Sequence, residues 1–291
     1  MVTQLYPFQS RFFDRSGLKM HFIDEGSGPA VVMLHGNPTW SFYYRNLVKS
    51  LRGQFRCIVP DHIGCGLSDK PSSQRYSYSL ADRIQDLTAL LDHLAIDRCT
   101  LIVHDWGGMI GAAWAVRHAE QVRSLVAMNT AAFRKPASKK LPTALWLGRN
   151  TWLGTVLIRG LNLFCSSAAS VGVQRKPLPP EVRKEYLRPY NSWRNRIAVD
   201  RFVKTIPLAE HDPGFDIILE VEQGLAALRD RPIMCAWGLR DFVFDQHFLN
   251  EWLVRFPHAV VHRYEDAGHY VLEDAEDDLR QRIHAFLTAN A

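Results

Sequence analysis

Short, mostly apolar runs alternate with amphipathic stretches along most of the chain. A run of four to seven apolar residues is typical of a strand that is buried on both faces of a parallel sheet. The predicted strands are 12–13, 18–23, 30–34, 56–59, 100–103, 122–128, 233–236 and 259–264. The predicted helices are 41–51, 79–94, 107–117, 216–228, 246–255 and 270–287. The alternation of the two kinds of segment indicates an α/β protein with helices on both faces of its sheet.

The alternation stops between residues 131 and 213, where helical patterns occur without a convincing strand. Right-handed crossovers give a mostly parallel, doubly wound sheet in which the carboxyl ends of the parallel strands share one edge. We therefore predict a core domain made of residues 1–130 and 214–291. An inserted helical cap, residues 131–213, is expected to lie over that edge.

The strongest chemical motif follows the strand at 100–103 and reads His104-Asp105-Trp106-Gly107-Gly108. An acidic side chain on a sharp strand-to-helix turn, with small residues behind it, is typical of a nucleophile elbow in which aspartate replaces serine. A carboxylate attacks an electrophilic carbon without first losing a proton and leaves an ester intermediate. Taken alone, Asp105 could equally be a helix N-cap.

Three further motifs follow other predicted strands. His35-Gly36-Asn37-Pro38 could supply a backbone N–H and the Asn37 amide to an oxyanion hole, or could simply form a turn. Asp241 could orient a histidine, and His269 could be that histidine, although each could also be an ordinary loop residue. The order Asp105, Asp241, His269 is that of nucleophile, acid and histidine in an α/β-hydrolase. Their joint occurrence at the expected strand ends favours this triad.

Charge is unevenly distributed along the chain. The net formal charge is +5, but residues 131–206 contain 15 Lys and Arg against three acidic residues, so this segment carries +12 and the remainder −7. Such asymmetry is compatible with a solvated basic face, or with a surface for anionic lipid or an acidic protein. No nucleic-acid motif accompanies the charge, so we do not expect nucleic acid as a partner.

We predict a cytoplasmic protein without a metal or cofactor. The prediction rests on the cysteines, the histidines and the length of the apolar runs. The five cysteines are scattered, which favours reduced thiols in the cytoplasm. The first eleven residues lack a secretory apolar region, and no run is long enough to span a bilayer, so membrane association would be peripheral. His258 and His262 straddle a predicted strand start, and there is no His-Glu-x-x-His motif. We therefore predict neither a metal site nor a cofactor.

The chain resembles the haloalkane-dehalogenase-like branch of the α/β-hydrolases. The motifs 35–40 and 104–108 carry this resemblance, and in that branch residues matching Asn37 and Trp106 donate hydrogen bonds to the leaving halide. The chain is similar, nearly end to end, to the β-lactone decarboxylases of bacterial long-chain olefin biosynthesis. The most specific segments are 5–8, 129–133, 189–197, 206–208 and 236–248. A departure from the general elbow is Val103, where glycine is common.

This resemblance implies a substrate and a reaction. The substrate would be a cis-3,4-dialkyl β-lactone (oxetan-2-one) with long chains, the products a cis-alkene and CO2, and the partners other enzymes of the olefin pathway. Two alkyl tails need an extended apolar cavity, since burial contributes about 0.8 kcal/mol per methylene. Eleven apolar residues between 145 and 164 either line this cavity or only pack the cap onto the sheet. They are Leu145, Trp146, Leu147, Trp152, Leu153, Val156, Leu157, Ile158, Leu161, Leu163 and Phe164.

Three alternatives remain open from the sequence. A haloalkane dehalogenase would use the same Asp105, with His269 activating water on an alkyl ester. An epoxide hydrolase would also use Asp105 but needs cap tyrosines as acids, for which Tyr186 and Tyr190 are the candidates. A non-catalytic binding module would be inert toward all three substrate classes.

Overall fold

The protein is an α/β sandwich built on one eight-stranded sheet. The computed structural model describes residues 4–291, so the first three residues of the predicted core domain lie outside it. The strand order is β1-β2-β4-β3-β5-β6-β7-β8, and every pair from β4 onward is parallel, whereas β1–β2 and β2–β4 are antiparallel. The strands are β1 Arg11–Arg15, β2 Leu18–Glu25, β3 Ala30–Leu34, β4 Arg56–Pro60, β5 Cys99–Asp105, β6 Val122–Thr130, β7 Ile233–Gly238 and β8 Val260–Tyr264.

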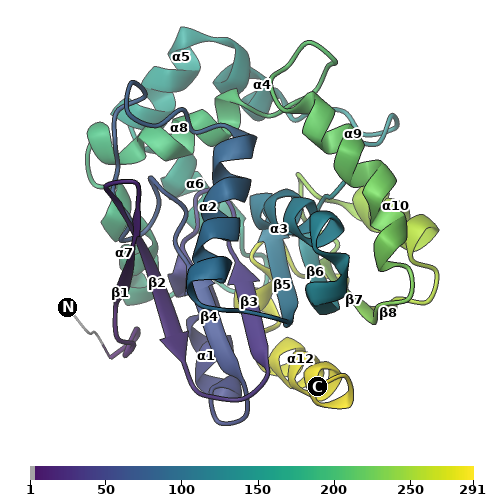
Figure 1. Ribbon diagram of the computed structural model, residues 1–291. Coiled ribbons are helices and arrows are strands. Elements are labelled where there is room, and N and C mark those ends of the chain that lie inside the picture. Colours follow the sequence, from purple (N-terminus) through teal and green to yellow (C-terminus); the bar gives the residue numbers. More distant parts are fainter. Residues whose placement is uncertain (1–3) are drawn as a thin grey trace.

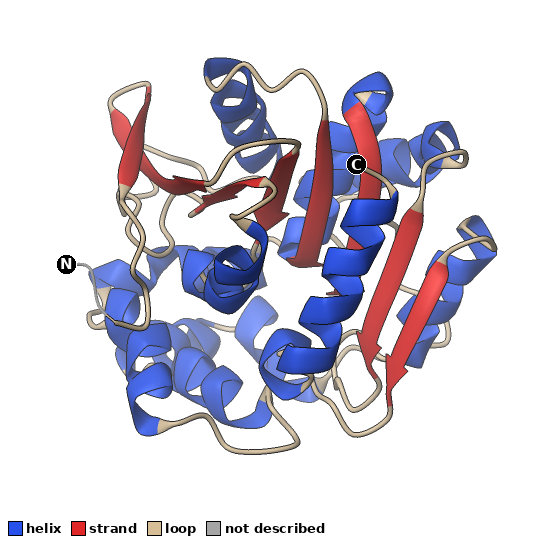
Figure 2. Cartoon of the chain, turned by 90° about the horizontal axis from the view of Figure 1, so that it is seen from below, coloured by secondary structure: helices blue, strands red, loops and turns tan. Residues whose placement is uncertain are grey.

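Helices cover both faces of the sheet, as Figure 2 shows. One face is packed against α1 (Arg45–Leu51), α11 (Val271–Asp274) and α12 (Glu276–Ala289). The other is packed against α2 (Leu80–His93), α3 (Trp106–Arg117), α9 (Phe215–Gly224) and α10 (Gln246–Arg255). Strand β5 contributes Ile102 to the first core and Leu101 and Val103 to the second, as the alternation of side chains along a strand requires. The predicted two-sided, mostly parallel sheet is confirmed.

The segment between β6 and α9 contains helices and loops. It holds α4 (Thr143–Asn150), α5 (Trp152–Thr155), a π-helical turn at Val156–Gly160, α6 (Leu163–Val171), α7 (Pro180–Leu187) and α8 (Ile197–Lys204). Figure 1 shows α4, α5 and α8 above the end of the sheet to which the parallel strands point. Among the described residues, no helix is long and apolar enough to cross a bilayer.

Three predicted helices differ from the structure. The predicted helix 216–228 is α-helical as α9 and ends in a 3-10 turn at Leu225–Leu228. The predicted helix 41–51 begins with a 3-10 turn at Ser41–Tyr44, and only Arg45–Leu51 is α-helical. The predicted closing helix 270–287 is broken at Ala275 into α11 and α12. The run Glu276-Asp277-Asp278 fills the first turn of α12, where acidic side chains interact favourably with the helix dipole. That run indicates a new helix start, which the apolar periodicity alone does not reveal.

Candidate active site

The elbow after β5 is a tight turn that presents Asp105. Its backbone has φ 51° and ψ −126°, a region that costs a non-glycine residue strain, and α3 begins at the next residue. A Cβ at Gly107 would lie 2.1 Å from the carbonyl oxygen of Leu34, and one at Gly108 would lie 1.8 Å from Thr130 Oγ1. The turn therefore requires the two glycines that follow Asp105-Trp106.

Val103 is accommodated by a glycine one turn into α3. A Cβ at Gly111 would lie 2.8 Å from Val103 Cγ1, so the small residue that many elbows carry on the strand is found here on the helix. The departure from the usual elbow pattern thus has a local compensation.

The loop after β3 holds the Asp105 carboxylate from the opposite side. The backbone N–H of Asn37 donates to Asp105 Oδ1 at 2.6 Å, which fulfils the expectation that this loop would turn an N–H toward the elbow. The Asn37 side chain, predicted to be a donor to the site, instead donates from Nδ2 to the carbonyl oxygen of Val199 in α8 at 3.2 Å. Asn37 still lines the cavity described below, and its Oδ1 is buried without a partner among the described residues.

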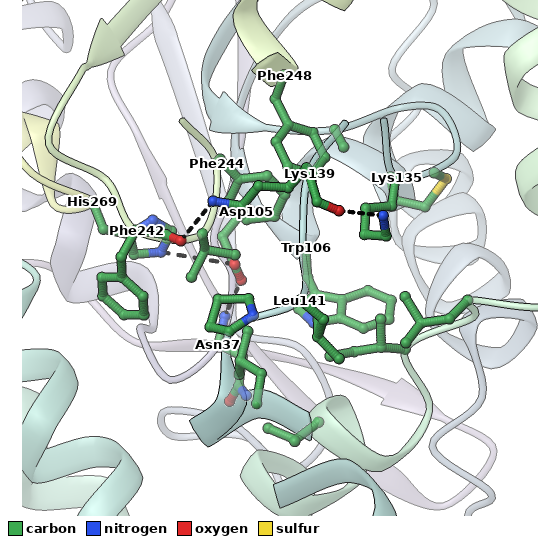
Figure 3. Close-up of a pocket in the computed structure, with 18 of the residues that line it drawn as sticks. Asn37, Asp105, Trp106, Lys135, Lys139, Leu141, Phe242, Phe244, Phe248 and His269 are labelled. Carbon is green, nitrogen blue, oxygen red and sulfur yellow. Dashed lines mark hydrogen bonds and ion pairs between the residues drawn. The ribbon is translucent and has the colours of Figure 1, made fainter. Parts of the chain in front are cut away.

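His269 lies between the two aspartates. Its Nδ1 is 2.7 Å from Asp241 Oδ2. Its Nε2 is 3.7 Å from Asp105 Oδ2, and Figure 3 shows these two side chains facing each other. All three side chains are buried. The structure therefore brings together the three residues that the strand-end motifs single out, although they come from loops separated by up to 164 positions.

Asn129 near the end of β6 fixes the loop that carries Asp241. Its Nδ2 donates to Asp241 Oδ2 at 3.0 Å and also to the carbonyl oxygens of Gly238 and Phe244, while its Oδ1 accepts the N–H of Gly238. Asn129 has φ 37° and is fully buried. The sequence marks Asn129 only as part of a family-like segment. Its position as a polar residue at the carboxyl end of a buried strand is the sequence feature that could have indicated its role in holding the Asp241 loop.

His104 supports His269 from below. His104 Nε2 donates to the carbonyl oxygen of His269 at 2.8 Å, and the two rings lie 4.5 Å apart. Tyr43 stands on the other side of His104, with ring centroids 4.6 Å apart. Burial, and then the neighbouring His269, hold the pKa of His104 well below its usual value, so His104 is a neutral donor.

The electrostatics favour an ion pair between His269 and Asp105. Burial raises the pKa of Asp105 above its usual value, and His269 together with the backbone N–H groups of Asn37 and Trp106 opposes that shift. Burial lowers the pKa of His269, but the carboxylate of Asp241, its hydrogen bond and Asp105 outweigh burial, so the pKa is raised above 6.5. The direction of this shift favours the protonated form of His269, and the charge of that form in turn favours the ionised form of Asp105.

A mainly apolar cavity of about 180 Å³ opens above Asp105. Asn37, Asp105, Trp106 and His269 form its polar end (Figure 3). The walls consist mostly of apolar side chains from α3, the segment after β6, α4, α6, α8, the loop before α9, α9 itself, the loop after β7 and α10. They include Met109, Phe133, Leu141, Leu145, Phe164, Val203, Ile206, Leu208, Ile218, Phe242, Phe244 and Phe248.

Two features of this cavity differ from the sequence analysis. Of the eleven cap residues considered for the alkyl cavity, Leu145 and Phe164 line it, whereas Ile158 is buried in the core and several others are exposed. One face of each of the short helices α4 and α5 is exposed to solvent, and the apolar composition of the segment does not reveal which residues lie on that face. In addition, Lys135, Lys139 and Lys140 contribute to the lining, although no motif in the sequence marks them as site residues.

The two tyrosines proposed as epoxide-hydrolase acids have other partners. The Tyr186 hydroxyl donates to Glu273, which also pairs with Arg45. The Tyr190 hydroxyl donates to the carbonyl oxygen of Thr39 at 3.0 Å. Neither residue lines the cavity above Asp105, so the arrangement does not supply the acid that an epoxide hydrolase requires.

Comparison with known proteins agrees with the observed fold and identifies a group of similar enzymes within the fold family. Residues 29–276 match the family described as alpha/beta hydrolase fold. A cis-3-alkyl-4-alkyloxetan-2-one decarboxylase of Shewanella oneidensis is 52% identical over 289 residues, which cover 99% of this chain and 91% of that protein. The corresponding enzyme of Xanthomonas campestris is 47% identical over 294 residues and covers 98% of both chains.

Haloalkane dehalogenases are more distant. Haloalkane dehalogenase 2 of Mycobacterium tuberculosis is 33% identical over 284 residues, covering 96% of this chain and 95% of that protein. The crystal structure of a mutant haloalkane dehalogenase from Agrobacterium tumefaciens covers 96% of both chains with a TM-score of 0.86 and 25% identity. The chain therefore belongs to the α/β hydrolase fold family and, within it, to the group that contains the cis-3-alkyl-4-alkyloxetan-2-one decarboxylases.

Proposed function

We propose that this protein is an enzyme that decarboxylates cis-3,4-dialkyl β-lactones to cis-alkenes and CO2, with Asp105 as nucleophile. The observation that carries the proposal is an aspartate on the elbow, within reach of a buried His269–Asp241 pair, at the polar end of an apolar cavity. The end-to-end identity of 52% with a decarboxylase of this name supports the substrate class.

The first step is ring opening by substitution at carbon. A carboxylate oxygen of Asp105 attacks the ring carbon that bears the ring oxygen, the carbon–oxygen bond of the ring breaks, and the centre inverts. The product is an alkyl ester of Asp105 with a free β-carboxylate. Trp106 and Asn37 line the cavity beside Asp105, and we assign them to binding the developing carboxylate, Asn37 through the second Nδ2 hydrogen, which its bond to Val199 leaves unused.

The second step is anti elimination. The bond to the carboxylate breaks and releases CO2, its electron pair forms the carbon–carbon double bond, and Asp105 departs as a carboxylate. Inversion followed by anti elimination gives the geometry of a direct syn loss, so a cis lactone yields a cis alkene. The cycle consumes neither water nor a proton.

His269 and Asp241 act electrostatically in this cycle rather than as a base. Because the pKa of His269 is raised, an imidazolium faces Asp105 before the attack and keeps the carboxylate ionised despite burial. The same cation stabilises Asp105 when it departs as an anion. Asp241 holds the imidazole ring and its charge in place.

The competing route attacks the lactone carbonyl. It gives an anhydride with Asp105, and hydrolysis of that anhydride would yield a β-hydroxy acid. The dehalogenase alternative, in which His269 activates water on an alkyl ester, uses the same side chains and would release halide from bromoalkanes. Both of these reactions need water, which separates them from the proposed decarboxylation.

The deciding experiment is mass spectrometry of the products after a cis-β-lactone is added to the pure protein. The proposal expects one cis-alkene and one CO2 per lactone, and no alkene with Asp105→Ala. A β-hydroxy acid as the main product, or halide release from a bromoalkane at about 1 per second or faster, would overturn it.

The surrounding assembly is a separate part of the proposal. We assign residues 131–213 to the cap and the remaining residues to the core, and we place the enzyme in the cytoplasm, with other enzymes of the olefin pathway as partners. The +12 charge of residues 131–206 supports contact with an acidic protein or an anionic membrane surface. Gel filtration with and without salt tests this, because charge-driven association weakens as salt rises.

A further inference from the structure

Large apolar side chains are exposed on the outer end of the segment between β6 and α9. Trp152 of α5 is 78% exposed, and Trp193 is 47% exposed. Val156 lies one helical turn after Trp152, and a Cβ at Gly160 would lie 3.6 Å from Val156 Cγ1 and 3.7 Å from Trp193 Cζ3, so the three side chains border one strip of surface. Figure 1 shows α5 at the end of the molecule opposite to α12. A strip with exposed tryptophans is unusual on a surface that meets only water.

A cleft with three arginines adjoins this strip. Arg75, Arg159 and Arg194 line it together with Ser72. The guanidinium of Arg159 lies 4.5 Å from the ring centroid of Trp193, and Arg194 is the next residue, so cleft and strip are continuous. This surface, made of Arg75, Trp152, Val156, Arg159, Trp193 and Arg194, is called the tryptophan–arginine face below.

The arginines of the cleft have no carboxylate in direct contact within the described chain. Arg75 donates to the carbonyl oxygen of Gly17, and Arg159 donates to that of Trp193, both of which are neutral acceptors. Among residues 4–291, Arg75, Arg159 and Arg194 form no ion pair with a carboxylate. In contrast, at least one such pair is formed by each of Arg45, Arg56, Arg134 and Arg255. Asp200 is the acidic group near Arg159, and Arg201 is a further cation nearby.

We propose that the tryptophan–arginine face docks the enzyme on an anionic phospholipid surface, with lipid phosphates in the arginine cleft and Trp152 and Trp193 at the level of the headgroups. Tryptophan is enriched at membrane interfaces because its ring is apolar while its N–H is polar. Arginine binds phosphate oxygens in a bidentate manner. Exposed indoles also suit a protein interface, but here they adjoin a cleft lined by three arginines and no acidic residue. A phosphate site beside an apolar strip matches the headgroup and the acyl region of a phospholipid, so we commit to lipid and leave an acidic protein as an outcome of the test.

The docked orientation connects the bilayer to the cavity above Asp105. Leu145 of α4 lines that cavity, and the neighbouring Trp146 is exposed on the same helix, next to α5. A long-chain substrate dissolved in the bilayer would then reach the apolar walls without crossing water. This step rests on the proposed function, whereas lipid binding itself does not.

Vesicle sedimentation tests the docking. We expect the protein to sediment with vesicles of phosphatidylcholine and phosphatidylglycerol, and far less with phosphatidylcholine alone, and high salt should release it. Arg75→Gln and Arg194→Gln should each weaken binding roughly fivefold, and Trp152→Ala with Trp193→Ala at least about tenfold. Matched controls are Arg229→Gln and Val254→Ala, which change exposed residues of other elements and should leave binding unchanged.

Three outcomes would overturn the docking proposal. They are no binding to anionic vesicles, equal binding by the face variants and the controls, or self-association that depends on Trp152 and Trp193 without vesicle binding. Asp105→Asn should bind vesicles like the native protein and the face variants should decarboxylate a short, water-soluble lactone normally. Failure of docking and failure of the proposed reaction are therefore separable.

Discussion

The floor of the cavity and the outer end of the segment between β6 and α9 differ in how far their side chains are buried and paired. At the floor, Asp105, Asp241 and His269 are buried and interact with one another, and Asn129 and His104 add hydrogen bonds that hold the loops. At the outer end, Trp152 and Trp193 are exposed beside arginines that lack carboxylate partners among the described residues. This difference is the one that our two proposals require, namely a floor that holds one reaction geometry and an outer end that meets another surface.

The largest effect is expected from removing the nucleophile. Asp105→Asn keeps the shape of the side chain and an oxygen for the Asn37 N–H, but it loses the charge that attacks carbon. Turnover should fall at least about 10⁴-fold, with thermal unfolding almost unchanged. Alkene formation measured by gas chromatography checks this, with Asp97→Asn, an exposed site, as the control. Substantial alkene from the variant would show that the floor is not the reaction centre.

Loss of the imidazolium should have a smaller effect. His269→Gln removes the cation beside Asp105 but no chemical reactant, so turnover should drop roughly 10²-fold. In intact-protein mass spectrometry during turnover, any ester that accumulates on Asp105 should still decay to alkene, because elimination requires no activated water. A stable adduct of substrate mass would instead indicate a dehalogenase-like second step in which His269 is the base.

The pH dependence of kcat also distinguishes His269 acting as a cation from His269 acting as a general base. The pKa of Asp105 is raised, so its carboxylate is lost as pH falls through a value above the usual 3.8. The pKa of His269 is raised, so its imidazolium is lost as pH rises through a value above 6.5. We expect kcat to be bell-shaped between these two values. A kcat that rises through the His269 pKa and then stays high would contradict the electrostatic role.

The buried amide at the end of β6 should affect both stability and rate. Asn129→Ala removes several hydrogen bonds and leaves the N–H of Gly238 buried without its partner, which costs about 1–3 kcal/mol of unfolding free energy. Because Asp241 then loses one support, kcat should fall roughly tenfold while KM changes little. Chemical denaturation and steady-state kinetics measure the two effects. Asn290→Ala near the C-terminus is the control.

In the segment between β6 and α9, the loss of stability on substitution should follow the burial of the side chain rather than its residue type. Ile158→Ala, at a buried position, should destabilise the fold by about 2–5 kcal/mol. Trp152→Ser, six residues earlier and largely exposed, should change stability by less than about 0.5 kcal/mol. Thermal unfolding of both variants compares them directly. Equal destabilisation would mean that Trp152 packs in the core, and the tryptophan–arginine face would then not exist.

The sequence predicts the sheet, the family and the meeting of the triad, because short apolar strands and polar residues at strand ends are local patterns. It does not predict the bonds of Asn129, which depend on the backbone path of a loop more than 100 positions away. It also assigns too many cap residues to the cavity, since Leu145 faces inward and Trp146 outward from the same helix. Hydrophobicity predicts which residues are buried, but not whether they pack in the core or line the cavity.

The central claim is that Asp105 opens the lactone and is regenerated without water. Many turnovers in oxygen-18 water, followed by mass spectrometry of the peptide that contains Asp105, test it most directly. The account predicts an unlabelled aspartate and unlabelled CO2 at first release. Oxygen-18 in Asp105 after repeated cycles would show that water cleaves a covalent intermediate and would contradict the proposed mechanism.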